Sequence, residues 1–403
     1  MNSTMPPLLP VTEARARISA SFTPLPAEQV GINEALGRVL AEDARARLTQ
    51  PPTAVSAMDG YAVRAADVQD PPARLRVVGE SPAGGHYPGA LGPGQAVRIF
   101  TGAPVPDGAD AVIMQEDTET DGAVVIVEIS AREGRHIRPQ GLDFRNGDVG
   151  LEAGRRLGPR EIGLAAAMNR PWLAVRRRPR VALLATGDEV ARPGDPLGPH
   201  QIVSSNTLAL AALATRAGAL AIDLGIAADD PETLQRMAAG AAGADILVTT
   251  GGASVGDHDL IQSALGAVGL EIDFWRVAMR PGKPLLFGHI GATPLLGVPG
   301  NPVSALVCGL LFLIPAIDAM LGDTAPPLPE TARLGRELPG NDHRQDYMRA
   351  RLERGPDGDL VATPFTRQDS AMLSTLAEAR CLVVRPPHAP PATAGARVEI
   401  IRL

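Results

Sequence analysis

The sequence predicts a multidomain protein that combines an α/β domain with β domains. Its 403 residues correspond to two to four domains at roughly 100–200 residues each. Hydrophobic residues make up 45% of the chain and charged residues 21%, which is enough apolar material to form packed cores. Strand-like segments and alternating strand and helix patterns occupy different parts of the chain. We therefore expect separate domains with a cleft between them.

The first part of the chain predicts a segmented helical domain. Two helical patterns lie between residues 11 and 43, and the second puts four apolar residues on one face of a 3.6-residue helix: Ile32, Leu36, Val39 and Leu40. Helical texture returns after residue 141. We expect residues 1–48 and 142–179 to form one domain around an inserted module.

Residues 49–141 predict an inserted β domain. Between residues 75 and 129, short apolar runs are separated by clusters of glycine, proline and aspartate, which is typical of strands joined by turns.

Residues 180–325 predict an α/β domain. Apolar strands alternate with helices, and one helix has Asp230 as N-cap with Pro231 at its first position. Another is expected to have Asn206 as N-cap and Gly218 at its end. Such a series predicts a mostly parallel sheet with helices on both faces, a three-layer arrangement.

The remaining residues, 326–403, return to β texture and predict a small C-terminal β domain. The apolar stretch after Asn301 has about 16 residues, or ~24 Å of helix, against the ~30 Å of a bilayer core. We expect a buried helix there, and no membrane contact.

Charge and cysteine content exclude several functions. The formal net charge of −7 argues against nucleic acid as a ligand. Two cysteines cannot form a disulfide framework or a four-thiolate zinc site, and the first 20 residues lack the pattern of a secretory signal. We therefore expect a cytoplasmic protein. Lys283 is the only lysine among 38 basic residues, which suggests that a compact ammonium is needed there, unless it is a remnant of biased arginine usage.

Two loops that follow strands carry possible site residues. In TTGGASVGDHD (249–259), Gly251 and Gly252 allow backbone amides to approach an anion and Ser254 adds a hydroxyl. Asp257 and Asp259 beside such a loop suggest Mg²⁺ carried with a phosphate. The alternatives are a plain tight turn and, for Glu189 in ATGDE (185–189), a turn or cap residue.

Two further motifs supply cations and a helix start. Arg276 precedes RPGKP (280–284), so three cations in eight residues predict an anion pocket, or otherwise an exposed basic turn. In PGNPVS (299–304), Asn301 is expected as N-cap with Pro302 at the first helical position, which either only starts a helix or also forms a phosphate seat.

In the β domain, Asp59 lies in SAMDGYA (56–62) and Thr101 begins TGAPVPDGADAV (101–112). Neither has a Ser-His-Asp, Cys-His or zinc-ligand pattern around it.

In chain order the six motifs are SAMDGYA, TGAPVPDGADAV, TGDE, TTGGASVGDHD, RPGKP and PGNPVS. In this order they resemble the motifs of the MoeA-type molybdopterin molybdenumtransferases, the family that includes the E domain of gephyrin. The resemblance runs through nearly the whole chain. It implies an elongated homodimer with a segmented helical domain, an inserted β domain, an α/β domain similar to the molybdopterin adenylyltransferases, and a C-terminal β barrel.

The resemblance also implies a reaction and a site. Adenylylated molybdopterin and molybdate would react with release of AMP, in a cleft between the α/β domain of one subunit and the β domain of the other. Mg²⁺ is the expected cofactor, and the adenylyltransferase and apo-molybdoenzymes are expected transient partners. The residues expected to be catalytic are Asp59, Glu189 and Asp259. Those expected to hold the metal are Asp257 and Asp259. Those expected to bind substrate are Thr101, Asp143, Thr186, Asp229, Gly251, Gly252, Ser254, Arg276, Arg280, Lys283, Asn301 and Ser304.

The chain departs from the family pattern at four positions. Arg276 and Arg280 stand where relatives often have lysine, Ser204 stands where an aspartate is common, and Asp369 replaces a glycine. Two other functions stay open: a molybdopterin adenylyltransferase, and a non-catalytic scaffold like the gephyrin E domain. The acidic residues expected in the cleft favour catalysis over the scaffold.

Overall fold

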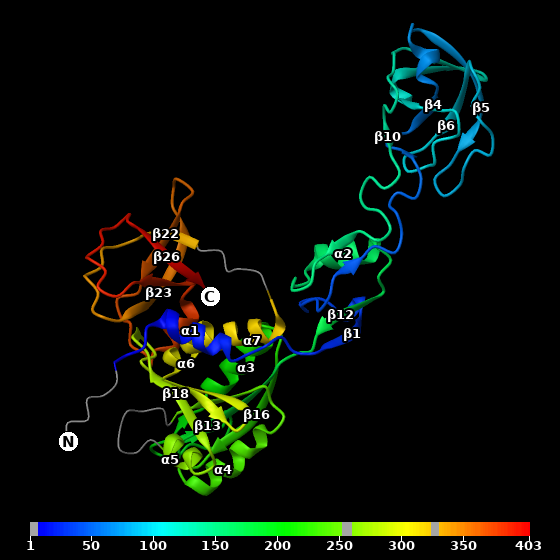
Figure 1. Cartoon of the computed structure of the whole chain (residues 1–403). Coiled ribbons are helices and arrows are strands. Elements are labelled where there is room, and N and C mark those ends of the chain that lie inside the picture. Colours follow the sequence, from blue (N-terminus) through cyan, green and yellow to red (C-terminus); the bar gives the residue numbers. More distant parts are fainter. Residues whose placement is uncertain (1–6, 252–259, 324–329) are drawn as a thin grey trace.

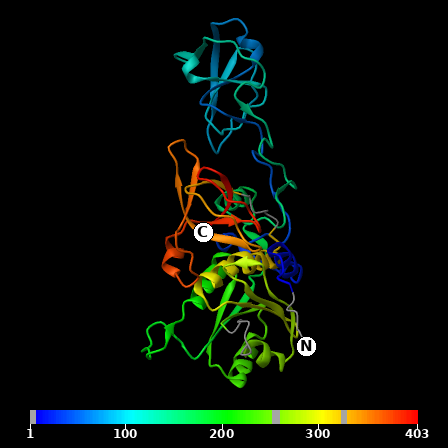
Figure 2. The ribbon, with the colours of Figure 1, turned by 90° about the vertical axis from the view of Figure 1, so that its left-hand side faces the viewer.

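The computed structural model describes residues 7–251, 260–323 and 330–403. The chain is elongated (Figures 1 and 2). A β domain lies at one end and the α/β domain at the other, next to a C-terminal β domain. A smaller segmented domain lies between the two ends. The expected multidomain architecture is confirmed.

The inserted β domain contains one six-stranded sheet in the order β7-β4-β6-β5-β9-β8. Its strands are β4 (Gly60–Val63), β5 (Ala73–Ser81), β6 (Gln95–Ile99), β7 (Ala111–Met114), β8 (Thr118–Asp121) and β9 (Val124–Val127). Apolar side chains form a core on each face of the sheet. At the base, β3 (Val55–Ser56) pairs with β10 (Ile137–Arg138), so entry and exit of the module lie side by side.

The segmented domain is built mainly from short strand pairs. β1 (Ala27–Gly31) pairs with β12 (Trp172–Arg176), and β2 (Ala44–Arg45) pairs with β11 (Val149–Leu151). Helix α2 (Pro159–Ala167) packs on β11. The two sequence segments therefore share one core.

The prediction of a helix around residues 32–40 is wrong. Only a 3₁₀ turn, η1 (Ile32–Glu34), forms there. Gly37 has φ +75°, which ends any helical run, and the amides of Gly37 and Leu40 donate to the carbonyl oxygens of Leu157 and Arg155. Leu36, expected on the buried face, is 60% exposed. Long-range backbone pairing replaced the local helical pattern at this position.

Helix α1 (Val11–Ala20) packs on the α/β domain, although the sequence-based grouping put residues 1–48 in the segmented domain. Val11, Ala14 and Ile18 are buried in the same core as the helices of the α/β domain. Its strongest helix contact is with α7 (Ile314–Leu321). An apolar helical face must be covered, but its spacing does not specify which domain covers it.

The α/β domain is a three-layer structure. Its sheet has the order β16-β13-β17-β21-β20-β18. The strands are β13 (Arg180–Thr186), β16 (Leu220–Ala227), β17 (Ile246–Thr250), β18 (Leu270–Arg276), β20 (Pro284–Ile290) and β21 (Thr293–Val298). The first four in the order are parallel, whereas β20 and β18 each run antiparallel to their neighbour. Cores on both faces hold the helices α3 (Asn206–Arg216), α4 (Pro231–Ala238), α5 (Leu260–Gly266), α6 (Pro302–Cys308) and α7.

Of the helix caps predicted for α3 and α4, the one at α4 is confirmed. The Asp230 carboxylate accepts a hydrogen bond from the Thr233 amide at 2.9 Å, and Pro231 is the first helical residue. At α3 the N-cap is Ser205, and the Asn206 side chain makes a different contact, described below.

Helices α6 and α7 are joined by a π-helical turn, η5 (Gly309–Leu313), into one helical stretch. Within the described ranges this stretch, Pro302–Leu321, is the one helix long and apolar enough to cross a membrane, and 67% of its apolar 18-residue segment is buried inside the protein. It is longer than the expected 16 residues because it continues past Asp318. Its burial agrees with the expected core helix.

The C-terminal domain is a closed β barrel, as the resemblance implied. Its strands are β22 (Glu330–Leu334), β23 (Gln345–Arg354), β24 (Leu360–Pro364), β25 (Cys381–Arg385) and β26 (Arg397–Arg402). The pairings β23–β24–β22–β26–β25–β23 close the ring, which removes free sheet edges. A short strand of the α/β domain, β19 (Met279–Arg280), pairs with β23 and joins the two domains.

Candidate functional site

The carboxyl ends of the parallel strands bring several predicted site residues to one edge of the α/β sheet. Thr186 ends β13, Gly251 follows β17, and Asn301 lies three residues after the end of β21. Asp229 follows β16, the neighbour of β13. This edge is where ligands bind in open α/β sheets. We call it the α/β rim.

The predicted cationic residues also lie at the α/β rim, because of the directions in which β20 and β18 run. Strand β20 runs antiparallel to β21, with Leu286 opposite Gly297, so its first residue, Pro284, lies at the carboxyl end of β21. Strand β18 is antiparallel to β20 and pairs Arg276 with Pro284. Arg276 and the RPGKP turn therefore also lie at the α/β rim.

Close backbone packing shapes the rim at Gly251. This residue has φ +92°, and a Cβ there would lie 2.7 Å from the carbonyl oxygen of Thr186. The Thr186 hydroxyl is buried and donates to the Thr250 carbonyl at 3.4 Å. Only glycine fits between these strands, so the loop begins close to the sheet.

Carboxylates surround the loop after β13. Gly187 has φ +134°, and a Cβ on it would lie 2.5 Å from Glu189 Oε2, so the exposed Glu189 side chain folds over this glycine. Asp188 Oδ1 accepts the Asp229 amide hydrogen at 3.0 Å, and Asp229 Oδ2 accepts the Asp188 amide hydrogen at 3.4 Å. Asp188, which sequence reasoning missed, therefore ties the two loops together.

Two asparagines fix the turn between β21 and α6. Asn206 Nδ2 donates to the Gly300 carbonyl at 2.7 Å, and Asn301 Nδ2 donates to Ser370 Oγ at 3.0 Å. Asn301 occupies the N-cap position of α6 but makes no side-chain cap; it contacts the C-terminal domain instead. Ser304, one turn into α6, is buried. Asn206 and Ser370 were not predicted as site residues. Asn206 was expected only as a helix cap, and Ser370 follows Asp369, which was noted only as a departure from the family pattern.

Two of the four departures from the family pattern have local explanations. Ser204 is buried, and its hydroxyl lies 3.4 Å from Thr207 Oγ1. Asp369 Oδ1 accepts the Ala371 amide hydrogen at 2.8 Å, so it stabilises the turn before α8 (Leu373–Glu378).

The RPGKP turn is packed on helix α6. Gly282 has φ +107°, and a Cβ there would lie 2.7 Å from Cys308 Sγ. Burial raises the pKa of the Cys308 thiol, so this sulfur is a packing group and not a nucleophile. Lys283, the next residue along the turn, is half-buried, and its ammonium forms no hydrogen bond or ion pair within the described part of the chain.

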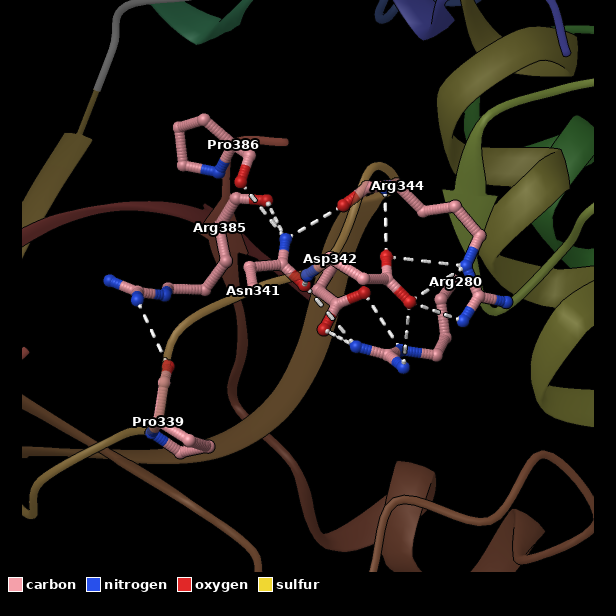
Figure 3. A network of polar contacts seen from close by, with 8 residues as sticks. Arg280, Pro339, Asn341, Asp342, Arg344, Arg385 and Pro386 are labelled. Atoms are coloured by element: carbon pink, nitrogen blue, oxygen red, sulfur yellow. Dashed lines mark hydrogen bonds and ion pairs between the residues drawn. The ribbon is translucent and has the colours of Figure 1, made fainter. Parts of the chain in front are cut away.

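Arg280 is engaged with the C-terminal barrel (Figure 3). Its Nε donates to Asp346 Oδ1 at 2.8 Å, its Nη2 contacts both Asp346 and Asn341, and its Nη1 lies 3.6 Å from Asp342 Oδ2. Asp346 raises the pKa of the Arg280 guanidinium. Arg344, which bonds Asp342 through both side chain and backbone, holds the pKa of that carboxyl far below its usual range. Carboxylates of the barrel therefore already compensate the charge of Arg280, and their contacts with it join the RPGKP turn to the barrel. The predicted contact of Arg280 with substrate remains a prediction.

Replacing Asp346 by asparagine should loosen this junction. We expect amide hydrogen exchange in residues 277–284 to become about tenfold faster, since a charged hydrogen bond between partly buried groups is lost. The matched control is Glu378→Gln. This variant removes an exposed ion pair with Arg351, in which both residues belong to the C-terminal domain, and it should leave exchange in residues 277–284 unchanged. Unchanged exchange in the Asp346 variant would contradict the junction.

Asp59 and Thr101 form a preorganised pair in the β domain. Asp59 Oδ1 accepts hydrogen bonds from the Thr101 amide at 2.7 Å and the Thr101 hydroxyl at 2.8 Å. These bonds, led by the one from the amide, lower the pKa of the Asp59 carboxyl below its usual value. A Cβ on Gly60 would lie 1.8 Å from the Ile113 carbonyl oxygen, so only glycine lets β4 approach β7 directly after Asp59.

The Asp59–Thr101 pair and the α/β rim lie in opposite parts of the chain. In Figures 1 and 2 the β domain is separated from the α/β domain by the segmented domain. Asp143 is exposed on the connection between them, where its amide donates to the Gln50 carbonyl at 3.0 Å. A single chain therefore does not bring all the predicted site residues together.

Four predicted site residues, Gly252, Ser254, Asp257 and Asp259, lie outside the described residues. Among the residues that are described, no group of three or more histidine, cysteine, aspartate or glutamate side chains could hold a metal ion. The Mg²⁺ site remains a prediction.

Three family models match the chain. Residues 9–169 match the MoeA N-terminal region (domain I and II), residues 182–319 a probable molybdopterin binding domain, and residues 331–403 the MoeA C-terminal region (domain IV).

Individual relatives agree with these models. The molybdopterin molybdenumtransferase of Nostoc sp. is 42% identical over 73% of this chain and 70% of its own length. That of Haemophilus influenzae is 33% identical over 98% of both chains. The crystal structure of a molybdopterin biosynthesis MoeA protein from Pyrococcus horikoshii is 32% identical, with a TM-score of 0.82 over 98% of this chain and 99% of that one. A second structure of the Pyrococcus horikoshii protein is 27% identical, with a TM-score of 0.88 over 98% of this chain and 100% of that chain.

Proposed function

This chain belongs to the MoeA family of molybdopterin molybdenumtransferases, and we propose that it transfers molybdenum in a site that two copies of the chain build together. The substrates are adenylylated molybdopterin and molybdate, and AMP is released. The observation that supports this proposal is the separation of two half-sites: an anion-binding rim on the α/β domain, and the Asp59–Thr101 pair on the distant β domain.

The α/β rim has the chemistry to hold two anions. Lys283 offers a positive charge on a turn that Gly282 presses against α6. Gly187 and Gly251 have positive φ angles, which let the chain turn sharply where β13 and β17 end. Loop amides at such strand ends are the groups that we propose to donate to a phosphate or molybdate oxygen. Glu189 lies at the same rim and is exposed. Arg276, half-buried beside them, adds charge.

Asp59 supplies the negative group that orients water. Its Oδ1 is occupied by both Thr101 donors, whereas its Oδ2 makes no hydrogen bond within the described residues. Because its pKa is lowered, the carboxylate is ionised at neutral pH and is suited to accept a hydrogen bond from water rather than to keep a proton. The oriented water attacks the phosphorus on the molybdopterin side, the P–O bond between that phosphorus and the bridging oxygen breaks, and AMP leaves with the bridging oxygen. The proton that the water loses passes to the product phosphates or to solvent.

Mg²⁺ would reduce the negative charge of the phosphates when bound. Asp257 and Asp259 are the proposed ligands, since carboxylate oxygens are the donors that this ion prefers. We place the reaction in the cytoplasm and propose the adenylyltransferase and apo-molybdoenzymes as transient partners.

Subunit mixing tests the shared site. Asp59→Asn and Lys283→Met each impair one half-site, so each homodimer should retain at most about a tenth of wild-type activity. After random subunit exchange, half of the dimers carry one intact site, and we expect about a quarter of wild-type activity. The control mixes Asp59→Asn with Thr101→Val, which both disable the same half-site and should not complement. Mixed dimers seen by native mass spectrometry without recovered activity would contradict the proposal.

The same assay separates the alternatives. Release of AMP that depends on molybdate indicates the molybdenumtransferase. An adenylyltransferase would instead form adenylylated molybdopterin from ATP, and a scaffold would do neither.

A further inference from the structure

We infer that Arg98, at the end of β6, is a positioning residue for the Asp59–Thr101 pair. The inference rests on the proposed role of Asp59. Arg98 lies opposite Tyr61 in the register of β4 and β6, and Tyr61 is two residues after Asp59. It lies outside every motif that the sequence analysis identified, because the nearest motif begins at Thr101.

Two aromatic rings hold the guanidinium. The Arg98 Cζ atom lies 5.1 Å from the centroid of the Tyr61 ring and 5.0 Å from that of Phe100. Both distances are within the range of cation–π attraction, and Tyr61 is itself buried. The guanidinium therefore lies over two rings, one in β4 two residues after Asp59 and one directly before Thr101.

Its hydrogen bonds go to the residues that hold Asp59. Arg98 Nη1 donates to the Gly60 carbonyl at 3.2 Å, and Nη2 donates to Gln115 Oε1 at 2.6 Å. The Gln115 amide in turn donates to the Asp59 carbonyl at 3.1 Å. Arg98 thus holds Gly60, which follows Asp59, and Gln115, which binds the Asp59 backbone.

Arg98 also acts on Asp59 through its charge. It is the charged group that lowers the pKa of the Asp59 carboxyl, after the two hydrogen bonds from Thr101. Asp59 is exposed, so water and salt screen this effect. A planar fork can bond two acceptors while its faces contact the rings, which an ammonium cannot do. The geometry thus predicts separable effects of charge and of shape.

Titration of Asp59 tests the charge without measuring activity. In the full-length protein with ¹³C-labelled aspartate, the Asp59 carboxyl signal is assigned by its loss in Asp59→Asn. In Arg98→Gln we expect its midpoint to rise at low salt, because the positive charge that favours the ionised carboxylate is lost. The rise should vanish at 1 M salt, where the Debye length is about 3 Å. Arg98→Lys keeps the charge and should keep most of the wild-type midpoint.

The turnover of the Arg98 variants tests whether the planar shape of the guanidinium is needed. We expect kcat for AMP release to fall about tenfold or more in both Arg98→Gln and Arg98→Lys, with KM for molybdate unchanged. Only Arg98→Gln should also move the acid limb of the pH profile upward. The matched control is Arg74→Gln in the same domain, whose guanidinium pairs with Asp121; it should behave as wild type.

The outcomes separate the possible failures. A folded Arg98→Gln variant with a wild-type Asp59 midpoint and wild-type kcat would overturn the inference. If Arg98→Gln does not fold, Arg98→Lys decides: wild-type kcat in that variant contradicts the positioning role. If Asp59→Asn is fully active, the catalytic role of Asp59 fails, while the titration still reports whether Arg98 acts on it.

Discussion

Replacing Asp59 by asparagine is expected to lower molybdate-dependent AMP release by about 100-fold or more, with the fold and ligand binding retained. The asparagine Oδ1 can still accept both hydrogen bonds from Thr101, so the side chain should keep its position. The group at the Oδ2 position becomes an amide that donates a hydrogen bond, so it no longer accepts one from water. We expect binding of adenylylated molybdopterin to be as tight or tighter, because a carboxylate repels a polyanion.

Ligand affinity and AMP release must be measured on the same preparation. The control is Asp121→Asn, which removes an exposed carboxylate from the same domain and should leave both quantities unchanged. Loss of binding with unchanged turnover per bound ligand would make Asp59 a recognition residue. The catalytic role would then pass to Glu189 or Asp259.

Replacing Lys283 by methionine is expected to lower kcat/KM by about 10–100-fold, the effect of losing a hydrogen bond from a charged group. The ammonium forms no hydrogen bond or ion pair with the described residues, and we expect it to bind an anionic group of the substrate. Lys283→Arg should not restore the wild-type value. The turn is pressed on Cys308 through Gly282, and it cannot move to admit a larger planar group.

Arg236→Met, on the exposed side of α4, is the control for a lost cation and should keep wild-type kcat/KM. Thermal unfolding of each variant checks that the fold is intact. Wild-type kcat/KM in Lys283→Arg would contradict the need for a compact ammonium and leave biased arginine usage as the reason for a single lysine.

Several elements of the site could be predicted because their signals are local. The cap at Asp230 and Pro231 follows from two adjacent residues. The alternation of strands and helices predicted the α/β sheet, and the carboxyl ends of its strands predicted where Thr186, Gly251 and Asn301 meet. The prediction of a helix at residues 32–40 was wrong because the contacts that decide the structure there are not local. Its backbone groups bond residues 155–157, more than 100 positions away, and no local pattern contains that information.

The sequence by itself determined the α/β domain, the two β domains, the family and the residue types gathered at the strand ends, since these depend on periodicity and on short motifs. Only the tertiary structure decided which of those side chains are already engaged. It pairs Arg280 with Asp346, joins Asn301 to Ser370, and leaves Lys283 without a partner among the described residues. It also separates Asp59 from the α/β rim and surrounds it with Arg98, Tyr61 and Gln115. These contacts depend on how distant segments pack, and packing is a property of the whole folded chain.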